Sequence, residues 1–160
     1  MMGHYGMKKL FVLLFLSLVS HSGFSEQSIN PEIKKSLVII SSSKDYSGAL
    51  KVAQEASSKI AIPLNLRALS ENKKAGLSFD KKTCIAGPVQ EYPCYQKRGK
   101  YDDGTYISIE YSSEYKEMTP ELYIVVVYSG SEAGKINSTL EKVKSLYKDA
   151  FRKNIKIYMD

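Results

Sequence analysis

The chain of 160 residues contains no tryptophan and only two histidines, and both histidines lie near the N-terminus. His4 and His21 fall in a segment with the features of a cleaved leader, so the predicted mature chain has no imidazole. Ser-His-Asp catalysis, Cys-His catalysis and imidazole-ligated metal sites all need histidine and are therefore excluded. Mechanisms that use carboxylates, lysine or tyrosine stay open, but we expect no enzymatic activity and no cofactor.

Long hydrophobic runs are also scarce, because only LFVLLFLSLV at residues 10–19 approaches the length of a membrane helix. A basic segment at residues 7–9 precedes this run and small residues follow it, as in a signal peptide. The run is too short to span a bilayer comfortably. We therefore predict a signal peptide over residues 1–25, cleaved after Ser25 or Ser22. The mature protein is expected to be periplasmic or secreted in the bacterial cell envelope, with no membrane span.

Charge of one sign is only mildly in excess. The chain has 23 basic and 17 acidic side chains, and loss of the leader removes Lys8 and Lys9. The mature net charge is then about +4 with the usual pKa assignments. This charge suits a negatively charged partner or a cell wall, but it is too small to indicate nucleic-acid binding.

Only two cysteines are present, Cys84 and Cys94, and they lack the C-x-x-C spacing of a redox motif. They flank a stretch with glycine and proline. In an oxidising compartment such a pair predicts a disulfide, which would contribute about 2–3 kcal/mol to stability.

The stretch VVVYSGSEAGKIN at residues 125–137 resembles a phosphate-binding loop. The required pattern places four residues between the two glycines and a hydroxyl side chain after the lysine. Here Gly130 and Gly134 are one residue too close, and Ile136 follows Lys135. We therefore interpret the stretch as a turn between a strand and a helix.

Hydrophobic periodicity predicts two β-α-β units. In the first, a strand at 37–42 precedes a helix at 44–60, capped by Ser43 or Asp45, and an alternating strand at 64–69. In the second, a strand at 122–127 precedes a helix and an alternating strand at 155–159. The apolar face of the second helix contains Ile136, Leu140, Val143 and Tyr147.

Two such units form an α+β domain of the split β-α-β (ferredoxin-like) type, with two helices on one face of an antiparallel sheet. The apolar strands 37–42 and 122–127 are expected in the middle, and the alternating strands at the edges. The predicted domain covers residues 26–160, with repeat one at 37–69, an insertion at 70–121 and repeat two at 122–160. Within the insertion, a strand at 105–112 is expected to form a hairpin with residues 95–101.

The repeated pattern is similar to a known family. LVIISSSKDYSGALKVAQEA and ELYIVVVYSGSEAGKINSTLEKVKSLYKDAFRKNIKIYM resemble the two repeats of the SPOR (sporulation-related repeat) domain of bacterial envelope proteins. The resemblance implies a sheet that binds peptidoglycan glycan strands lacking stem peptides, without catalysis. The family has no counterpart of the insertion, which would cover the open sheet face if it folded back onto it.

A glycan surface needs aromatic rings for stacking and polar groups for hydrogen bonds to sugar oxygens. The open sheet face and the insertion supply such residues, and the predicted glycan-binding set is Asn65, Arg67, Tyr106, Lys156 and Tyr158. The alternative is that these are solvated side chains that prevent edge pairing.

The insertion is rich in tyrosine, with Tyr92, Tyr95, Tyr101, Tyr106, Tyr111 and Tyr115. Clustered tyrosines favour recognition of a protein, so the alternative function is an interaction or inhibitor module that binds an envelope protein. A third function, hydrolysis by a carboxylate pair, would draw on Asp102, Asp103, Glu110, Glu114 and Glu117. We interpret these acids as a turn and a solvated face.

Overall fold

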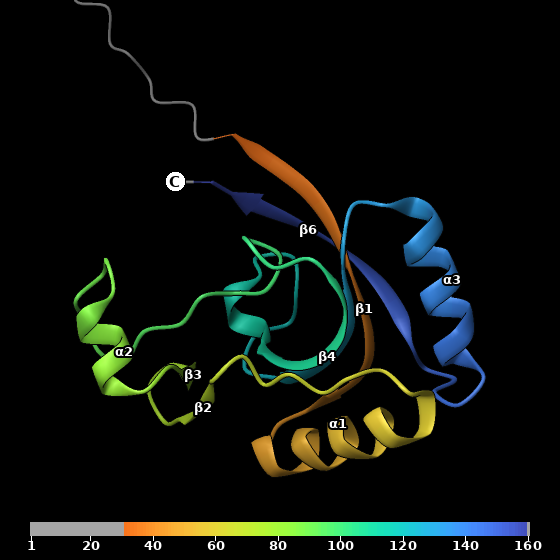
Figure 1. The fold of residues 1–160 in the computed structure, drawn as a ribbon, viewed down its shortest axis with the longest axis horizontal. Coiled ribbons are helices and arrows are strands. Elements are labelled where there is room, and N and C mark those ends of the chain that lie inside the picture. The colour runs from red at the N-terminus through yellow and green to blue at the C-terminus, as the bar shows by residue number, and fades with distance from the viewer. Residues whose placement is uncertain (1–30, 160) are drawn as a thin grey trace, which may run out of the picture.

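The computed structural model describes residues 31–159, so the predicted leader and its cleavage sites lie outside the described residues. The described chain has an α+β fold built on a four-stranded antiparallel sheet (Figure 1). Within these residues, no helix has the length and apolar character needed to cross a membrane.

The sheet has the strand order β4-β5-β1-β6, and each neighbouring pair is antiparallel. Its strands are β1 (Glu32–Ser43), β4 (Gly104–Tyr111), β5 (Tyr123–Gly130) and β6 (Phe151–Tyr158). The helices are α1 (Tyr46–Ile60), α2 (Lys81–Ala86) and α3 (Ala133–Lys144). The remaining elements are the hairpin β2 (Ser70–Asn72) and β3 (Gly76–Ser78) and the 3-10 turn η1 (Ser112–Glu114).

The two central strands are the predicted ones. β1 pairs with β5 through residues 36–43 and with β6 through residues 32–39, so it is longer than the apolar run that predicted it. Both faces of β5 and of β1 at residues 36–40 are buried, which explains why the sequence from Leu37 to Ile40 and that of β5 are largely apolar without alternation. β6 lies at an edge and alternates: Ile155 and Ile157 are buried, whereas Lys156 and Tyr158 are exposed.

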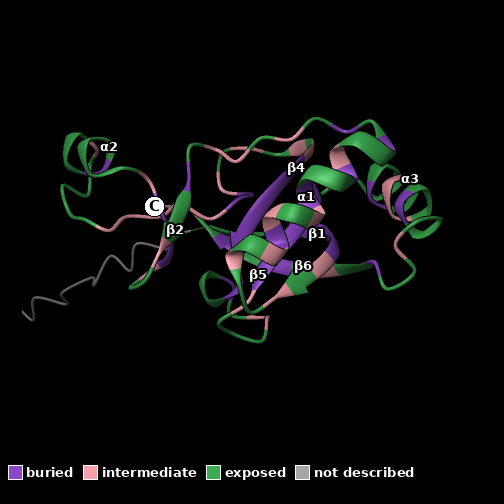
Figure 2. Ribbon diagram, turned by 90° about the horizontal axis from the view of Figure 1, so that it is seen from below, coloured by how far each residue is buried: buried purple, intermediate pink, exposed green. Residues whose placement is uncertain are grey.

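The helices α1 and α3 cover one face of the sheet, as predicted. The Asp45 carboxylate caps α1 by accepting a hydrogen bond from the Gly48 N–H at 2.6 Å. The buried side of each helix joins the same core as Val38 and Val125 of the sheet. Figure 2 shows buried residues on the sheet strands and exposed residues on the outer sides of both helices.

Residues 64–69 do not form the predicted edge strand. Leu64 makes one parallel bridge to Ile107, and the chain then turns because Arg67 and Ala68 have positive φ angles of 58° and 56°. The Asn65 side chain stabilises this turn by accepting a hydrogen bond from the Arg67 N–H at 2.8 Å. Left-handed backbone cannot continue a strand, so the alternation of apolar residues here reflects a turn.

The strand predicted at 105–112 is present as β4, but the predicted pairing of this strand with residues 95–101 is wrong. β4 pairs with β5, and residues 95–101 form no strand. β4 thereby occupies the edge position that was predicted for residues 64–69. The strand order and directions stay compatible with a split β-α-β arrangement.

The sheet face opposite α1 and α3 is covered by the insertion. Tyr115 of the insertion belongs to a second core with sheet residues such as Leu37, Val126 and Ile155, and Met118 packs against this core. Leu37 and Val126 have no exposed surface. The insertion therefore adds a third layer on the face where the glycan surface was predicted.

The predicted disulfide is present. Cys84 and Cys94 are joined with an S–S distance of 2.10 Å and a Cα–Cα distance of 5.6 Å. The bond lies in residues 70–101, which we name the disulfide lobe. The part of this lobe that contains α2 and the β2–β3 hairpin lies at the end of the molecule away from α3 (Figure 1).

The turn of the β2–β3 hairpin gives a test of how the lobe packs on the sheet. Gly76 has a φ of 70°, and a Cβ at this position would overlap the ring of Tyr111. We expect Gly76→Ala to lower the free energy of unfolding by more than about 2 kcal/mol, because it adds backbone strain and a clash. Urea unfolding measures this change.

Gly134 provides the matched control. It lies in the first turn of α3, and a Cβ there meets no atom within 4 Å. Gly134→Ala should leave stability unchanged or raise it by up to about 1 kcal/mol, because alanine favours a helix. Equal effects of the two substitutions would contradict the packing described for Gly76.

Candidate functional site

The structure separates the five predicted glycan-binding residues into two groups. Asn65, Arg67 and Tyr106 lie on or beside β4 at one edge of the sheet. Lys156 and Tyr158 lie on β6 at the opposite edge, with β5 and β1 between them. The five residues therefore do not form one surface.

Arg67 belongs to a buried charge cluster. Its side chain is only 7% exposed, and its Nη1 donates hydrogen bonds to both carboxylate oxygens of Glu110, at 3.0 and 2.9 Å. Its Nε lies 2.7 Å from a carboxylate oxygen of Asp102, and its Nη2 donates to the Gln96 carbonyl. Burial alone would lower the pKa of Arg67, but the charges of Glu110 and Asp102 raise it on balance.

Glu110 is the centre of this cluster and is completely buried. Besides Arg67, its carboxylate accepts hydrogen bonds from the Tyr95 hydroxyl, from the Ser108 hydroxyl at 2.8 Å and from the Arg98 N–H at 3.2 Å. The Tyr115 hydroxyl is a further donor at 3.4 Å. These donors occupy the oxygen lone pairs, so the carboxylate is not available to a substrate.

The guanidinium of Arg98 is the second buried cation. It lies over the ring of Tyr106, with 3.6 Å between the guanidinium carbon and the ring centroid. Its Nη1 donates to the Ser108 hydroxyl at 3.0 Å and to the Val126 carbonyl at 3.1 Å. Its Nη2 donates to the Gly104 carbonyl at 2.8 Å. Burial lowers the pKa of Arg98.

Tyr106 is therefore oriented by the cluster. Its hydroxyl donates a hydrogen bond to Asp102 at 3.1 Å, and burial raises its pKa to about 12. Burial also raises the pKa values of Tyr95 and Tyr115 well above the ordinary value. Together these contacts attach the disulfide lobe and the segment after β4 to the sheet. We interpret the cluster as structural.

Sequence reasoning missed Arg98. It lies among Gln96, Lys97 and Lys100, and no local pattern separates it from exposed basic residues. The one available signal is its chemistry, because a planar guanidinium with five donors suits burial among carbonyls better than an ammonium group does.

We name the paired strands β1 and β6 the β1–β6 ribbon. The second group, Lys156 and Tyr158, lies at the end of this ribbon where β6 pairs with the first residues of β1. Lys156 forms an ion pair with Glu32 at 3.1 Å, and the Tyr158 hydroxyl donates to the same carboxylate at 3.2 Å. The hydrogen bond with Glu32 raises the pKa of Lys156. The ammonium group of Lys116 lies 5.5 Å from the centre of the Tyr158 ring.

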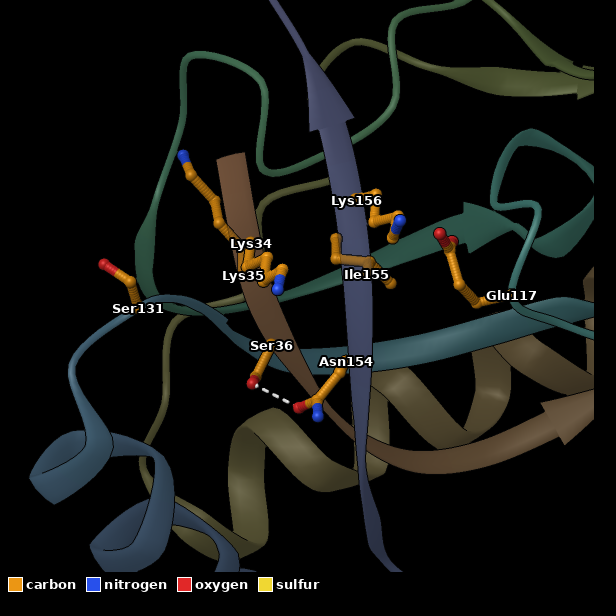
Figure 3. A pocket seen from close by; sticks show the side chains of 8 residues that line it. All are labelled: Lys34, Lys35, Ser36, Glu117, Ser131, Asn154, Ile155 and Lys156. Atoms are coloured by element: carbon orange, nitrogen blue, oxygen red, sulfur yellow. Dashed lines mark hydrogen bonds between the residues drawn. The ribbon is translucent and has the colours of Figure 1, made fainter. Parts of the chain in front are cut away.

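A cavity of about 400 Å³ lies beside this group (Figure 3). We name it the lysine cavity, and its lining residues are Lys34, Lys35, Ser36, Glu117, Ser131, Asn154, Ile155 and Lys156. Figure 3 shows that Ser36 and Asn154 point toward one another from β1 and β6, and the Ser36 hydroxyl donates to the Asn154 side-chain oxygen at 2.9 Å.

Two hydrogen-bond donors in the lysine cavity have no acceptor in the described part of the chain. Within residues 31–159, the ammonium group of Lys34 makes no hydrogen bond or ion pair, and the side-chain nitrogen of Asn154 donates to no group. By contrast, the ammonium group of Lys35 is held by the Gly99 carbonyl at 2.6 Å and by Asp103 at 2.8 Å. The cavity therefore presents an ammonium and an amide that can bind oxygen atoms of a ligand.

The charge cluster predicts a large loss of stability when its anion is removed. Glu110→Gln keeps the shape of the side chain but removes the fully buried anion of the cluster, so the partly exposed Asp102 is the remaining counter-ion of Arg67. We expect the free energy of unfolding to fall by about 3–5 kcal/mol in urea denaturation. Glu55→Gln removes an exposed partner of Lys59 and should change it by less than about 0.5 kcal/mol. Similar effects of both changes would show that the cluster contributes little.

The buried tyrosines predict a loss of stability at alkaline pH. A group whose pKa is raised on folding stabilises the native state fully below its unfolded pKa, which is 10.0 for tyrosine. This contribution is lost as the pH rises from there through the folded value, which is about 12 for Tyr106. In this window the phenolate absorbance of the folded protein should stay below that of the urea-unfolded chain. Tyr106→Phe should reduce the difference in phenolate absorbance between the folded and the unfolded chain. If the titration curves of the folded and the unfolded chain coincide, the burial of these hydroxyls is refuted.

The comparisons with known proteins add no assignment. No protein-family model matches the chain, and neither curated proteins nor solved structures show a match to it. No group of three or more histidine, cysteine, aspartate or glutamate side chains in the described part of the chain is arranged to hold a metal ion. The resemblance to the SPOR domain stays a prediction.

Proposed function

We propose that this protein is an exported cell-envelope domain that binds peptidoglycan glycan strands without covalent chemistry, and that the lysine cavity is the contact site. The observation that carries this proposal is the pair of uncommitted donors, Lys34 and Asn154, beside Lys156 and Tyr158. Only the last two belong to the glycan-binding set predicted from the sequence.

The chemistry of the cavity suits such a strand. An amide nitrogen donates to hydroxyl and acetamido oxygens, and an ammonium group pairs with the carboxylates that are exposed where stem peptides have been removed. Tyr158 is 38% exposed at the edge of the sheet, and its ring can offer an apolar face to a sugar. Polar donors next to one aromatic face are what a carbohydrate surface requires.

The position of the proposed site follows from the third layer. The middle of the sheet face is buried under Tyr115 and Met118, so a glycan cannot reach it. Arg67 and Tyr106 are held in the charge cluster and are not assigned to binding. We therefore assign the proposed contact to the end of the β1–β6 ribbon, where Lys156 and Tyr158 lie.

The disulfide supports the proposed compartment. A cross-link between Cys84 and Cys94 is compatible with an extracytoplasmic location, because cytoplasmic thiols are kept reduced. Peptidoglycan is accessible only from that side of the cytoplasmic membrane.

Co-sedimentation with amidase-treated peptidoglycan tests the proposal. We expect the protein to pellet at low salt, and the double change Lys34→Ala and Asn154→Ala should weaken binding by about tenfold or more, since two hydrogen bonds, one of them charged, are removed. Lys142→Ala removes an exposed lysine of α3 and should have little effect. No pelleting of the unaltered protein, or an equal loss in the Lys142 variant, would refute glycan binding at the cavity.

A further inference from the structure

Large exposed apolar side chains gather in the disulfide lobe. Of the exposed large hydrophobic residues in the described chain, four lie between residues 85 and 101: Ile85, Val89, Tyr92 and Tyr101. Val89 is 66% exposed and Tyr101 is 63% exposed. Exposed apolar side chains that are grouped on one element mark an interaction site more often than isolated ones do.

Two of these exposed residues, Val89 and Tyr101, line one cleft in the disulfide lobe. It has a volume of about 610 Å³, and its lining includes Pro88, Val89, Lys97 and Tyr101. Both cysteines of the disulfide also line it. A cavity of this size lies within the range of about 300–1,000 Å³ that is typical of binding pockets.

Hydrogen bonds and the disulfide hold the residues around the cleft in place in the unbound protein. The Asp80 carboxylate caps α2 by accepting a hydrogen bond from the Thr83 N–H at 3.0 Å. The Phe79 N–H donates to the Cys94 carbonyl at 3.0 Å, and the Cys94 N–H donates to the Ser78 hydroxyl at 3.1 Å. With the disulfide, these bonds reduce the ordering cost of binding.

The lobe is also basic. Residues 70–101 contain six lysines but only three acidic side chains. Lys97 and Lys100 line the cleft with Glu114, and Lys97 donates to the backbone carbonyl of Glu114 at 3.2 Å. A positive rim around an apolar cleft is complementary to an apolar residue with acidic neighbours.

We propose that the disulfide lobe is a docking site for a partner protein, and that the cleft receives an apolar or aromatic side chain flanked by aspartate or glutamate. The concave shape favours a protruding side chain over a lipid surface, because insertion into a bilayer needs a projecting apolar group. This site shares no residue with the lysine cavity, so the docking proposal can be tested independently of glycan binding.

Selection from a phage-displayed library of random peptides, with the disulfide-bonded full-length protein as the target, tests the proposal. The enriched peptides should contain Leu, Ile, Phe, Tyr or Trp next to acidic residues. Synthetic copies of them should bind Val89→Ser and Tyr101→Ala about tenfold more weakly or worse, because each substitution removes apolar contact from a wall of the cleft. Both positions are exposed, so the variants should keep the melting temperature of the unaltered protein.

Leu146→Ser is the matched control, because Leu146 is an exposed apolar residue that follows α3. It should bind the selected peptides as the unaltered protein does. Peptides without acidic residues, or equal weakening by Leu146→Ser, would overturn the proposal.

Two further measurements separate the possible occupants. Vesicles of phosphatidylglycerol and phosphatidylcholine should not bind the protein through the lobe. If they bind and Val89→Ser abolishes the binding, the occupant of the cleft is a membrane surface and the proposed protein partner is refuted. The Val89 and Tyr101 variants should pellet with amidase-treated peptidoglycan as the unaltered protein does. Their loss from the pellet would show that the lobe serves glycan binding, which contradicts a separate docking site.

Discussion

The arrangement of this protein depends on one buried carboxylate, that of Glu110. The groups that surround it come from three parts of the chain: Arg67 from the turn after α1, Tyr95 and Arg98 from the disulfide lobe, and Tyr115 from the segment after β4. Burying two guanidinium groups is costly unless an anion and hydrogen-bond acceptors accompany them. Glu110 supplies the anion at the sheet and thereby favours the position in which the insertion lies.

Because the contacts of Glu110 hold the insertion on the sheet, the domain over residues 31–159 has three layers and no open sheet face. With α1 and α3 on one face and the insertion on the other, β1 and β5 are enclosed on both sides. Surfaces for ligands are then left at the periphery, at the end of the β1–β6 ribbon and on the disulfide lobe. In the proposed function, a polymer would therefore contact the end of the sheet and not its face.

The sequence predicted those parts of the fold whose signals are local. Strands buried on both faces are continuously apolar, a helix start needs a capping residue such as Asp45, and two cysteines allow only one intramolecular pair. The strand at 64–69 was wrong because a turn with positive φ at Arg67 can show the same alternation as a strand. The partner of β4 was wrong because the Asp-Gly turn before β4 does not determine whether it pairs with the preceding segment or with the following strand β5. Arg98 and Glu110 resemble exposed charges in the sequence, since burial of an ion pair is decided by contacts far along the chain.

The same long-range contacts decide which lysines remain for a ligand. Lys35 lines the lysine cavity, but its ammonium group holds the Gly99 carbonyl and the Asp103 carboxylate, so it connects β1 to the end of the insertion. Releasing it would leave a carbonyl and a carboxylate without their partner. Its neighbour Lys34 points away from these acceptors, because successive residues of a strand face opposite sides. Alternation along β1 therefore holds Lys35 in the structure, and it leaves Lys34 without these partners, as the proposed glycan site requires.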